Sequence, residues 1–404
     1  MHIVFFNRSY YPDPEASGQF LTELAEDLAA KGEDVSVVCG TSYHVKQKHR
    51  RLPLEVQTRN GVRVIRVPNT QLPKSSFIGR LVNLGTYLAG CLLALCVLRR
   101  PDVVVSQTDP PLLPVVAVPY AKLSRARFIF AINDLYPDVA VALGEISNPL
   151  WLKLLDFASR FGLRHADVVT VLGEDMKSKV MAKGCPARKI AVTRHWADLD
   201  RIRPRKEQNE FRQKHGFVPS DLIIMYSGNV GLSQRLEDLL HVARELRESE
   251  NVYFLIVGEG AYKERLKAIA AQLELNGKVR FFPYQAKERL DQSLSAADLH
   301  LIPLARGVAG SLVPCKMYGI MASGTPYLAI MDGDSEAVHI AEQYECGFHC
   351  PPNSRAELKG HIEFAIRNRA LLHAMGRNGR RAAEQEFSRS VASERYHMLI
   401  RSVA

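Results

Sequence analysis

Short apolar runs rich in β-branched residues alternate with stretches of helical periodicity throughout the first half of the chain. In the stretch Gly18–Lys31, for example, Leu21, Leu24 and Leu28 fall on one face of a helix. Strands are predicted at Ile3–Asn7, Asp34–Cys39, Val62–Val67, Val103–Ser106, Arg127–Ala131 and Val168–Leu172. Because apolar runs separated by helices indicate strands covered on both faces, the pattern predicts a parallel sheet in an α/β layer.

The second half of the chain repeats this pattern. Strands are predicted at Leu222–Ser227, Val252–Val257, Val279–Phe282, Leu299–Pro303, Pro326–Ile330 and Gly347–Cys350, and helices at Arg235–Ser249, Tyr262–Leu273 and Lys287–Ala296. The two halves meet at the polar segment Asp198–Arg205, and the final stretch Ser390–Val403 is amphipathic. Since 404 residues exceed one ordinary core, we predict two Rossmann-like domains, at residues 1–200 and 201–385, followed by a C-terminal helix at 386–404.

One uncharged stretch, Leu81–Leu98, approaches the length of about 20 residues that a membrane-spanning helix needs. A span is excluded, because the stretch runs directly into the next predicted strand and would place two parts of one sheet on opposite sides of a bilayer. Two interpretations stay open: a buried core helix, or an apolar helix lying on a membrane surface. Cations flank the stretch at Lys74, Arg80, Arg99 and Arg100. They would suit an anionic surface.

The charge of the chain favours anionic partners. Its formal net charge of +10 suits nucleotide phosphates or an anionic membrane. No zinc-finger or RNA-binding pattern is present, so nucleic acid is not an expected partner. The seven scattered cysteines and the absence of a secretory signal favour a cytoplasmic protein. Cys346, His349 and Cys350 stand close together, but one such cluster is more typical of free thiols than of a metal site.

Ligands of open α/β sheets bind at the carboxyl ends of the strands, where loop amides and helix N-termini gather. After the first predicted strand, Gly18 either permits the close approach of a phosphate or merely enables a turn. After Arg127–Ala131, the residues Asn133, Asp134 and Tyr136 are placed for a cleft. Asp134 is a candidate for binding a sugar hydroxyl or acting as a base, with capping of the next turn as the alternative.

Glycine-rich turns follow two strands of the second half. Gly228 and Asn229 follow the first of them, and Arg235 begins the next predicted helix, an order typical of a phosphate-binding turn. A second glycine-rich loop, after Leu299–Pro303, carries Arg306 at one end and Lys316 at the other. Because arginine and lysine are the usual protein partners of phosphate, we predict that this loop binds a diphosphate.

The segment Met321-Ala322-Ser323-Gly324-Thr325-Pro326 resembles the signature of glycosyltransferase family 4, whose fold is GT-B. Val257–Gly260, Ala297–Pro303 and Trp196–Pro204 are similar to other landmarks of that family and occur in the same order. The resemblance covers nearly the whole chain. It implies an α/β protein with two Rossmann-like domains facing across a cleft, and a C-terminal helix that crosses back to the first domain.

Asn133–Asp138 followed by Val141–Gly144 resembles a branch of the family that builds bacterial O-antigens and exopolysaccharides and includes fucosamine transferases. The resemblance implies transfer of a hexose or amino sugar, with retention, from a nucleotide-diphosphate sugar. The expected donor is a UDP-sugar, and the expected acceptor is a glycan or a polyprenyl-linked glycan. We expect no metal and no further cofactor. The expected location is the cytoplasm, with peripheral attachment to the inner face of the cell membrane.

The resemblance also assigns roles to residues. The catalytic residues are Asp134 and Lys316, and Asn133 and Tyr136 are expected on the acceptor side. The expected donor-binding residues are Gly18, Gly228, Asn229, Gln234, Arg235, Glu259, Tyr284, Arg306, Ser311, Leu312, Val313 and Gly319. Lys316 and Arg306, helped by the amides of Ser311–Val313, would stabilise the leaving diphosphate. Asp134 would orient the acceptor.

The chain departs from the family pattern at five positions. Two glutamates of the family fall at Ser311 and Gly319, and its phosphate-binding Arg and Lys fall at Asn229 and Gln234. Its histidine before the acidic residue falls at Asn133. Two alternatives to a transferase therefore stay open: a catalytically silent GT-B scaffold or partner protein, and a GT-B epimerase of nucleotide sugars.

Overall fold

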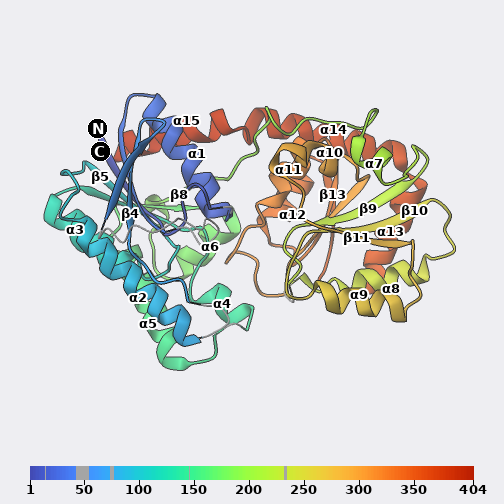
Figure 1. The fold of residues 1–404 in the computed structure, drawn as a ribbon, viewed down its shortest axis with the longest axis horizontal. Helices are drawn as coiled ribbons and strands as arrows, with labels where there is room; N and C mark the ends of the chain where they lie inside the picture. Colours follow the sequence, from blue (N-terminus) through green and yellow to red (C-terminus); the bar gives the residue numbers. More distant parts are fainter. Residues whose placement is uncertain (14, 42–53, 73–76, 145, 232–233) are drawn as a thin grey trace. The chain divides into compact units, whose positions relative to one another are not determined.

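The structure is a computed structural model that describes residues 1–13, 15–41, 54–72, 77–144, 146–231 and 234–404. Lys74, one of the cations flanking Leu81–Leu98, lies outside these residues. The chain divides into two compact units (Figure 1), each an α/β layer. The first unit comprises Met1–Arg194 and Ala392–Ala404, and the second comprises His195–Val391.

The sheet of the first unit has the strand order β3-β4-β2-β1-β5-β6-β7-β8 among the described residues. All neighbouring strands are parallel except β3 and β4, which pair antiparallel. The strands are β1 (His2–Phe6), β2 (Asp34–Gly40), β3 (Glu55–Arg59), β4 (Val62–Val67), β5 (Val103–Gln107), β6 (Arg127–Ala131), β7 (Val168–Val171) and β8 (Ile190–Val192). The central strands β1 and β5 are buried throughout, which explains their continuous apolar sequences.

Helices cover both faces of this sheet. They are α1 (Ala16–Ala30), α2 (Phe77–Ala94), α3 (Pro114–Ser124), α4 (Asp138–Ala142), α5 (Pro149–His165) and α6 (Glu174–Ala182), with a short 3-10 helix at Ala187–Lys189. Most of the uncharged stretch Leu81–Leu98 lies in α2. Its residues Tyr87, Cys91 and Ala94 are buried in the core. Within the described residues, no helix is long and apolar enough to cross a membrane.

The sheet of the second unit has the strand order β11-β10-β9-β12-β13-β14 and is parallel. Its strands are β9 (Leu222–Ser227), β10 (Val252–Val257), β11 (Val279–Phe282), β12 (Leu299–Pro303), β13 (Tyr327–Ile330) and β14 (Gly347–Cys350). Its helices are α7 (Glu210–Lys214), α8 (Glu237–Glu245), α9 (Lys263–Gln272), α10 (Leu290–Ser295), α11 (Lys316–Ala322), α12 (Glu336–Gln343), α13 (Arg355–Arg367) and α14 (Arg369–Glu386), with a 3-10 turn η3 at Lys287–Arg289.

Two predicted helices of this unit need correction. The helix predicted at Arg235–Ser249 begins only at Glu237 and ends at Glu245. Arg235 has a φ of 44°, in the left-handed region, and therefore cannot lie in the first turn of an α-helix. The helix predicted at Lys287–Ala296 is divided into the 3-10 turn η3 and the short helix α10.

Each sheet contains one place where the strand order reverses direction. In the first unit it lies between β1 and β5, and in the second it lies between β9 and β12. The loops that leave two such strands diverge to opposite sides, so a hollow forms at the carboxyl ends of the strands. The loops after β1 and β5, and those after β9 and β12, are therefore the places where a ligand site is expected in each unit.

The C-terminal helix α15 (Arg389–Val403) joins the first unit from Ala392 onward. The hydroxyls of Tyr396 and Thr170 lie 3.2 Å apart, which fixes the helix against β7. The ring Nε2 of His397 lies 2.7 Å from Glu33 Oε1, and the other carboxylate oxygen, Oε2, accepts a hydrogen bond from the N-terminal ammonium of Met1 at 2.8 Å. The first unit is thus completed by residues from the far end of the chain.

Candidate functional site

Two glycine turns of the second unit are joined through their backbones. The amide of Gly228 donates to Val257 O at 2.9 Å, and that of Val230 donates to Glu259 O at 2.8 Å. Gly228, Gly258 and Gly260 have φ values of 146°, 147° and 159°. A Cβ atom on Gly258 would lie 1.9 Å from Gly228 O, so only glycine permits this approach. The predicted phosphate-binding turn after β9 is therefore held against the turn after β10 by backbone hydrogen bonds and close packing.

Lys316 extends from the first turn of α11 to this pair of turns. Its Nζ donates to the hydroxyl of Tyr226 at 3.1 Å and lies 4.3 Å from the centre of the Tyr226 ring. A Cβ atom on Gly228 would lie only 2.9 Å from the same Nζ. Two predicted donor-site residues from different loops, Lys316 and Gly228, therefore meet at the point where the strand order reverses between β9 and β12.

The electrostatics around Lys316 favour an anionic ligand. Desolvation by the surrounding protein lowers the pKa of Lys316 to about 8, and burial raises the pKa of Tyr226 above its usual range. The Tyr226 hydroxyl donates its proton to Asn229 O at 2.6 Å, so it receives the Lys316 bond on a lone pair. Among the described residues, no carboxylate lies within ion-pair distance of Lys316. A bound diphosphate would supply the missing negative charge.

Arg306, the second cation predicted to hold the diphosphate, lies at the surface beside a carboxylate of another loop. The Arg306 side chain is 72% exposed, and its Nε lies 4.0 Å from a carboxylate oxygen of Asp332, in the loop after β13. The same carboxylate accepts the amide of Gly307 at 2.6 Å. Asp332 therefore anchors the beginning of the glycine-rich loop and partly neutralises Arg306.

The amides of Ser311–Val313 are not all available to a phosphate. Ser311, predicted to bind the donor, is buried, and its amide donates to Val308 O at 2.9 Å. Val313 is also buried, whereas Leu312 is half-buried. Gly319 lies in α11, and a Cβ atom there would meet Ile202 and Leu294 at an ordinary 3.6 Å. The position where the family has a ribose-binding acid thus borders apolar side chains.

Gln234 stabilises the turn after β9, and Arg235 borders it. Gln234 accepts the amide of Gly231 at 2.9 Å and so closes the turn that begins at Gly228. Arg235 lines a small hollow together with Gln234, Leu304 and residues of the loop before α13. Arg235 thus lies next to the turn and precedes the helix that it was predicted to begin.

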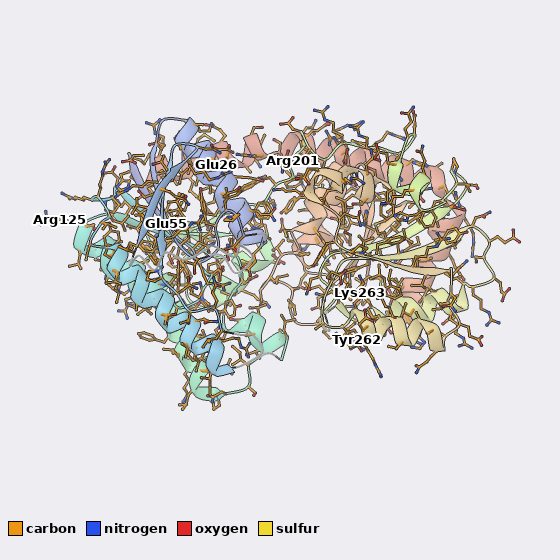
Figure 2. The ribbon with its side chains drawn as sticks, in the orientation of Figure 1. Glu26, Glu55, Arg125, Arg201, Tyr262 and Lys263 are labelled. Atoms are coloured by element: carbon orange, nitrogen blue, oxygen red, sulfur yellow. The ribbon has the colours of Figure 1, made fainter. Side chains whose placement is uncertain are left out.

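Lys263 is a site residue that the sequence analysis missed. Lys263, labelled with Tyr262 in Figure 2, is 6% exposed at the beginning of α9. Its Nζ donates to Gly258 O at 2.8 Å, to Phe282 O at 3.0 Å and to the Glu259 carboxylate at 2.7 Å. Lys263 therefore holds together the carboxyl ends of β10 and β11. The spacing of Glu259 and Lys263, one helical turn apart, was its only sequence signal.

Glu259 and Tyr284, both predicted to bind the donor, lie at the rim of this second-unit site. The Glu259 side chain is 53% exposed and Tyr284 is 54% exposed. Burial, together with the charge of Glu259, raises the pKa of the Tyr284 phenol. An exposed aromatic ring next to a carboxylate offers a stacking surface and a hydrogen-bond acceptor, the two groups that a nucleoside needs.

The first unit has a pocket of about 390 Å³ at the carboxyl ends of β1, β5 and β6. One wall is apolar and comes from α2 and α5, including Leu81, Leu84, Trp151 and Leu155. The other wall is polar. It comes from the loops after the three strands and from the first turn of α1, and it contains Arg8, Glu15, Ser17, Thr108, Asp109, Asn133, Asp134 and Tyr136. The structure thus brings the predicted residues Asn133, Asp134 and Tyr136 to one pocket.

The polar wall includes a charged cluster that the sequence analysis did not identify. Arg8 donates to Asp109 at 3.1 Å and to Glu15 at 3.2 Å. The hydroxyl of Ser9 lies 2.6 Å from Glu15 and 2.8 Å from Asp109. The position of Arg8 directly after β1, and of Asp109 directly after β5, was the signal available in the sequence.

Asp134 is held on the same wall by its backbone. The amides of Asn133 and Asp134 both donate to the hydroxyl of Thr108, at 3.1 and 3.2 Å, and Asn133 Nδ2 lies 3.4 Å from Gln107 Oε1. Carboxylates accept hydrogen bonds from hydroxyls, and aromatic rings pack on the apolar faces of ligands. The pocket therefore has the groups that bind a sugar.

Gly18 lies in the first turn of α1 and serves a packing role. A Cβ atom on Gly18 would lie 3.1 Å from Ser9, so glycine lets α1 pack closely on the loop after β1. The hydroxyl of Thr22 donates to Gly18 O at 2.7 Å. Gly18 therefore shapes the loop that carries Arg8 and Ser9, beside the first-unit pocket.

Cys346, His349 and Cys350 do not form a metal site. The Cys346 thiol donates to Ile340 O, the Cys350 thiol donates to Pro351 O, and His349 Nε2 lies 2.9 Å from Met331 O. Burial raises the pKa of both thiols to about 12, so neither is a thiolate at neutral pH. Within the described residues, no three His, Cys, Asp or Glu side chains are grouped to hold a metal ion.

Comparison with known proteins identifies both halves of the chain. Residues 16–196 match the sequence model of a glycosyl transferase 4-like domain, and residues 207–382 match glycosyl transferases group 1. WcaI of Escherichia coli (strain K12), described as a colanic acid biosynthesis glycosyl transferase, is 27% identical over 85% of this chain and 86% of its own length. WbjE of Pseudomonas aeruginosa, described as a glycosyltransferase, is 27% identical over 75% of each chain.

Solved structures show the same fold. HepE of Anabaena, solved in complex with UDP, has a TM-score of 0.76 and 16% identity over 100% of both chains. WaaG, a glycosyltransferase involved in lipopolysaccharide biosynthesis, has a TM-score of 0.72 and 18% identity over 98% of this chain and 99% of its own. The fold is GT-B, as predicted. The chain is a glycosyltransferase whose residues 207–382 match glycosyl transferases group 1 and whose residues 16–196 match a glycosyl transferase 4-like domain.

Proposed function

We propose that this glycosyltransferase moves a hexose or amino sugar, with retention, from a UDP-sugar to a lipid-linked glycan in the synthesis of a bacterial surface polysaccharide. The observation that carries the proposal is the position of Lys316, whose Nζ lies beside Gly228 without a carboxylate partner among the described residues. A cation at the end of a glycine turn is suited to the leaving diphosphate of such a donor.

Two comparisons support a uridine donor and a polysaccharide product. HepE has been solved with UDP and with UDP-glucose. WcaI is described as a colanic acid enzyme and WaaG as a lipopolysaccharide enzyme. In the proposed arrangement, the exposed ring of Tyr284 and the carboxylate of Glu259 face the nucleoside. The turns around Gly228 and Gly258 hold the diphosphate.

The proposed acceptor site is the pocket of the first unit. Its carboxylates Asp134, Glu15 and Asp109 would accept hydrogen bonds from sugar hydroxyls, and Tyr136 and Trp151 would pack on the apolar side of the ring. The apolar wall formed by α2 and α5 suits a lipid attached to the glycan. Since nucleotide sugars are made in the cytoplasm, we place the reaction at the inner face of the cell membrane.

The proposed reaction breaks the bond between the anomeric carbon and the β-phosphate oxygen. An acceptor hydroxyl forms the new bond on the face that the phosphate leaves, and its proton passes to the departing phosphate oxygen. Lys316 stabilises the negative charge that develops on this phosphate, and Asp134 orients the hydroxyl. The scheme assigns the positive charge to Lys316 and calls on no resident metal ion.

The proposal is tested by binding and by turnover. Calorimetry of the full chain with UDP and with GDP should show binding of UDP, and incubation with UDP-sugars and membrane extract should transfer sugar to lipid. The replacements at Ser311 and Gly319 are the reason to test a silent scaffold and an epimerase beside the transferase. Absence of binding of either nucleotide contradicts the proposal. Binding without turnover favours the scaffold, and conversion of the UDP-sugar without transfer favours the epimerase.

A further inference from the structure

The outward face of α2 is apolar over the whole length of the helix. Its exposed large side chains are Ile78, Val82, Leu92 and Leu93, which are 71%, 39%, 55% and 50% exposed. Between them, the exposed positions are Gly85 and Ala89, so the helix presents one continuous uncharged face. The charged residue of α2 is Arg80, which lies near the beginning of the helix. One face of α2 is thus in the core, as the first interpretation of Leu81–Leu98 predicts, and the other face is exposed.

α5 presents a second apolar stripe to solvent. Leu150, Leu154 and Phe157 are 75%, 40% and 58% exposed and lie on one face of the helix. The opposite face is buried through Leu155 and Ala158. A soluble helix normally carries polar residues at its exposed positions, so this stripe needs a partner.

α2 and α5 are neighbours, so their exposed stripes belong to one surface. Leu84 and Leu88 of α2 pack with Trp151 of α5 around the buried residues Leu155 and Ala158. Figure 1 shows the two helices on the same side of the first unit. We name this surface the α2/α5 face. It consists of Ile78, Val82, Leu92, Leu93, Leu150, Leu154 and Phe157.

Cations flank the α2/α5 face. Lys153 and Arg164 are exposed on α5 beside its apolar stripe, and Arg80 is exposed on the side of α2 that lines the first-unit pocket. None of these three side chains has a carboxylate partner among the described ion pairs, whereas Arg160 pairs with Asp156 at 2.7 Å. An apolar surface bordered by unpaired cations is typical of helices that lie in the headgroup layer of an anionic membrane.

We propose that the α2/α5 face docks on a lipid bilayer that contains anionic headgroups. The apolar side chains enter the boundary between headgroups and acyl chains, and Lys153 and Arg164 lie against the phosphates. Charge complementarity favours a bilayer over a second copy of this chain, because two copies would bring the same cations together. The helices lie on the membrane, since neither is long and apolar enough to cross it.

Docking in this way would give the first-unit pocket direct access to the bilayer. Leu81 and Leu84 of α2, and Trp151 and Leu155 of α5, line that pocket. Arg80 lines it too, at the beginning of α2. Resting on the proposed function, this geometry points to an acceptor whose lipid chain stays in the bilayer, whose phosphate meets Arg80 and whose sugar enters the pocket.

Vesicle sedimentation of the full chain tests the proposal. Wild type should bind vesicles of phosphatidylcholine with phosphatidylglycerol at least tenfold more strongly than vesicles of phosphatidylcholine alone. Leu150→Gln/Phe157→Gln should weaken the binding at least tenfold. Phe364→Gln is the matched control, because Phe364 is 42% exposed on α13 and contacts Phe348, as Phe157 contacts Phe161. All variants alter exposed side chains, and unchanged UDP affinity and unfolding temperature would show that they fold.

Equal vesicle binding by wild type and the double variant would overturn the proposal. So would equal binding to both kinds of vesicle, because the cations would then have no role. A wild-type dimer that the double variant converts to a monomer, without vesicle binding, would assign the face to a second copy instead. Vesicle binding is measured without nucleotide, so its failure is distinguishable from a failure of UDP binding or of sugar transfer.

Discussion

Lys316 Nζ lies 3.1 Å from the hydroxyl of Tyr226, which donates its own proton to Asn229 O at 2.6 Å. Tyr226 therefore links the first turn of α11 to the glycine turn after β9. This link holds a cation where the family pattern would have its phosphate-binding residues, which here are Asn229 and Gln234. The turn after β9 thus lacks the Arg and Lys of the family pattern, and Lys316 of α11 places a cation at that turn instead.

Replacement of Lys316 should weaken nucleotide binding. Lys316→Met keeps the length of the side chain but removes the charged hydrogen bond to phosphate, so the affinity for UDP should fall about 10- to 100-fold. Arg306→Met is the matched control, because Arg306 is 72% exposed and faces Asp332. Its effect on the calorimetric Kd should be within about threefold. Equal losses in both variants would show that the two cations act together, as the sequence alone indicates.

The affinity for UDP should decrease at alkaline pH. The pKa of Lys316 is lowered to about 8, and only its ammonium form attracts a diphosphate. The Kd should therefore rise as pH increases through about 8 and approach tenfold per pH unit above it. Lys316→Met should show no such increase over the same range. A wild-type Kd that stays constant up to pH 9.5, measured by calorimetry, would contradict this assignment of the charge.

The same pKa has an effect of opposite sign on folding. The folded pKa of about 8 lies below the ordinary lysine value of 10.5, so between these two values the unfolded chain binds more protons. The contribution of Lys316 to stability should thus increase with pH in that window. At pH 7 the buried ammonium costs stability, and Lys316→Met should unfold at a higher temperature than wild type. An unfolding temperature lowered by this substitution would be the contrary result.

Tyr226→Phe should affect binding through Lys316. The variant removes the acceptor that positions Nζ, so the UDP affinity should fall about 3- to 30-fold, and its pH dependence should shift. Tyr327→Phe is the control, since Tyr327 is equally buried and its hydroxyl donates to Ala337 O at 2.8 Å, away from Lys316. Both variants should lose similar stability. Tyr226→Phe with an unchanged pH profile would show that its hydroxyl has only a structural role.

Asp134→Asn should lower turnover without weakening the donor. Asp134 lines the pocket of the first unit, whereas Lys316 belongs to the second. If Asp134 orients the acceptor hydroxyl, kcat should fall about 10- to 100-fold while the Kd for UDP stays constant. Asp138→Asn is a suitable control, because Asp138 pairs with Lys183 at 2.7 Å and does not line the pocket. The role is refuted if both variants keep wild-type kcat.

Gly258→Ala should destabilise the second unit. The new Cβ would lie 1.9 Å from Gly228 O, at a φ of 147°, so the two turns would have to separate. We expect a loss of more than about 3 kcal/mol together with weaker UDP binding. Gly277 has a φ of 83°, but no atom lies within 4 Å of the position of an added Cβ. Gly277→Ala should therefore cost only about 1 kcal/mol of stability. Thermal unfolding compares the two, and similar losses would contradict the importance of the close approach.

The sequence predicted the two sheets well, because buried parallel strands have continuous apolar sequences. Val103–Ser106 and Leu222–Ser227, for example, lie in β5 and β9. It also predicted that Asn133, Asp134 and Tyr136 would lie at the end of a strand, and they line one pocket. Helix boundaries were less accurate, since the left-handed backbone of Arg235 has no counterpart in the hydrophobic pattern.

The partners of charged side chains could not be predicted. Lys263 is held mainly by backbone carbonyls, which every residue has, so its role leaves little trace in the sequence. Arg306 and Lys316 flank one loop, but Arg306 lies beside Asp332, which follows a different strand. Arg8 and Asp109 are brought together only because β1 and β5 are neighbours in the sheet.

The position of α15 has a consequence for the order of folding during synthesis. The second unit is continuous from His195 to Val391, so all of it has been translated before the chain ends. The first unit needs Ala392–Ala404, where His397 reaches Glu33 and Tyr396 reaches Thr170. On the ribosome, the half that is made first is therefore the half that is finished last, and a chain stopped before α15 leaves the buried carboxylate of Glu33 without its histidine.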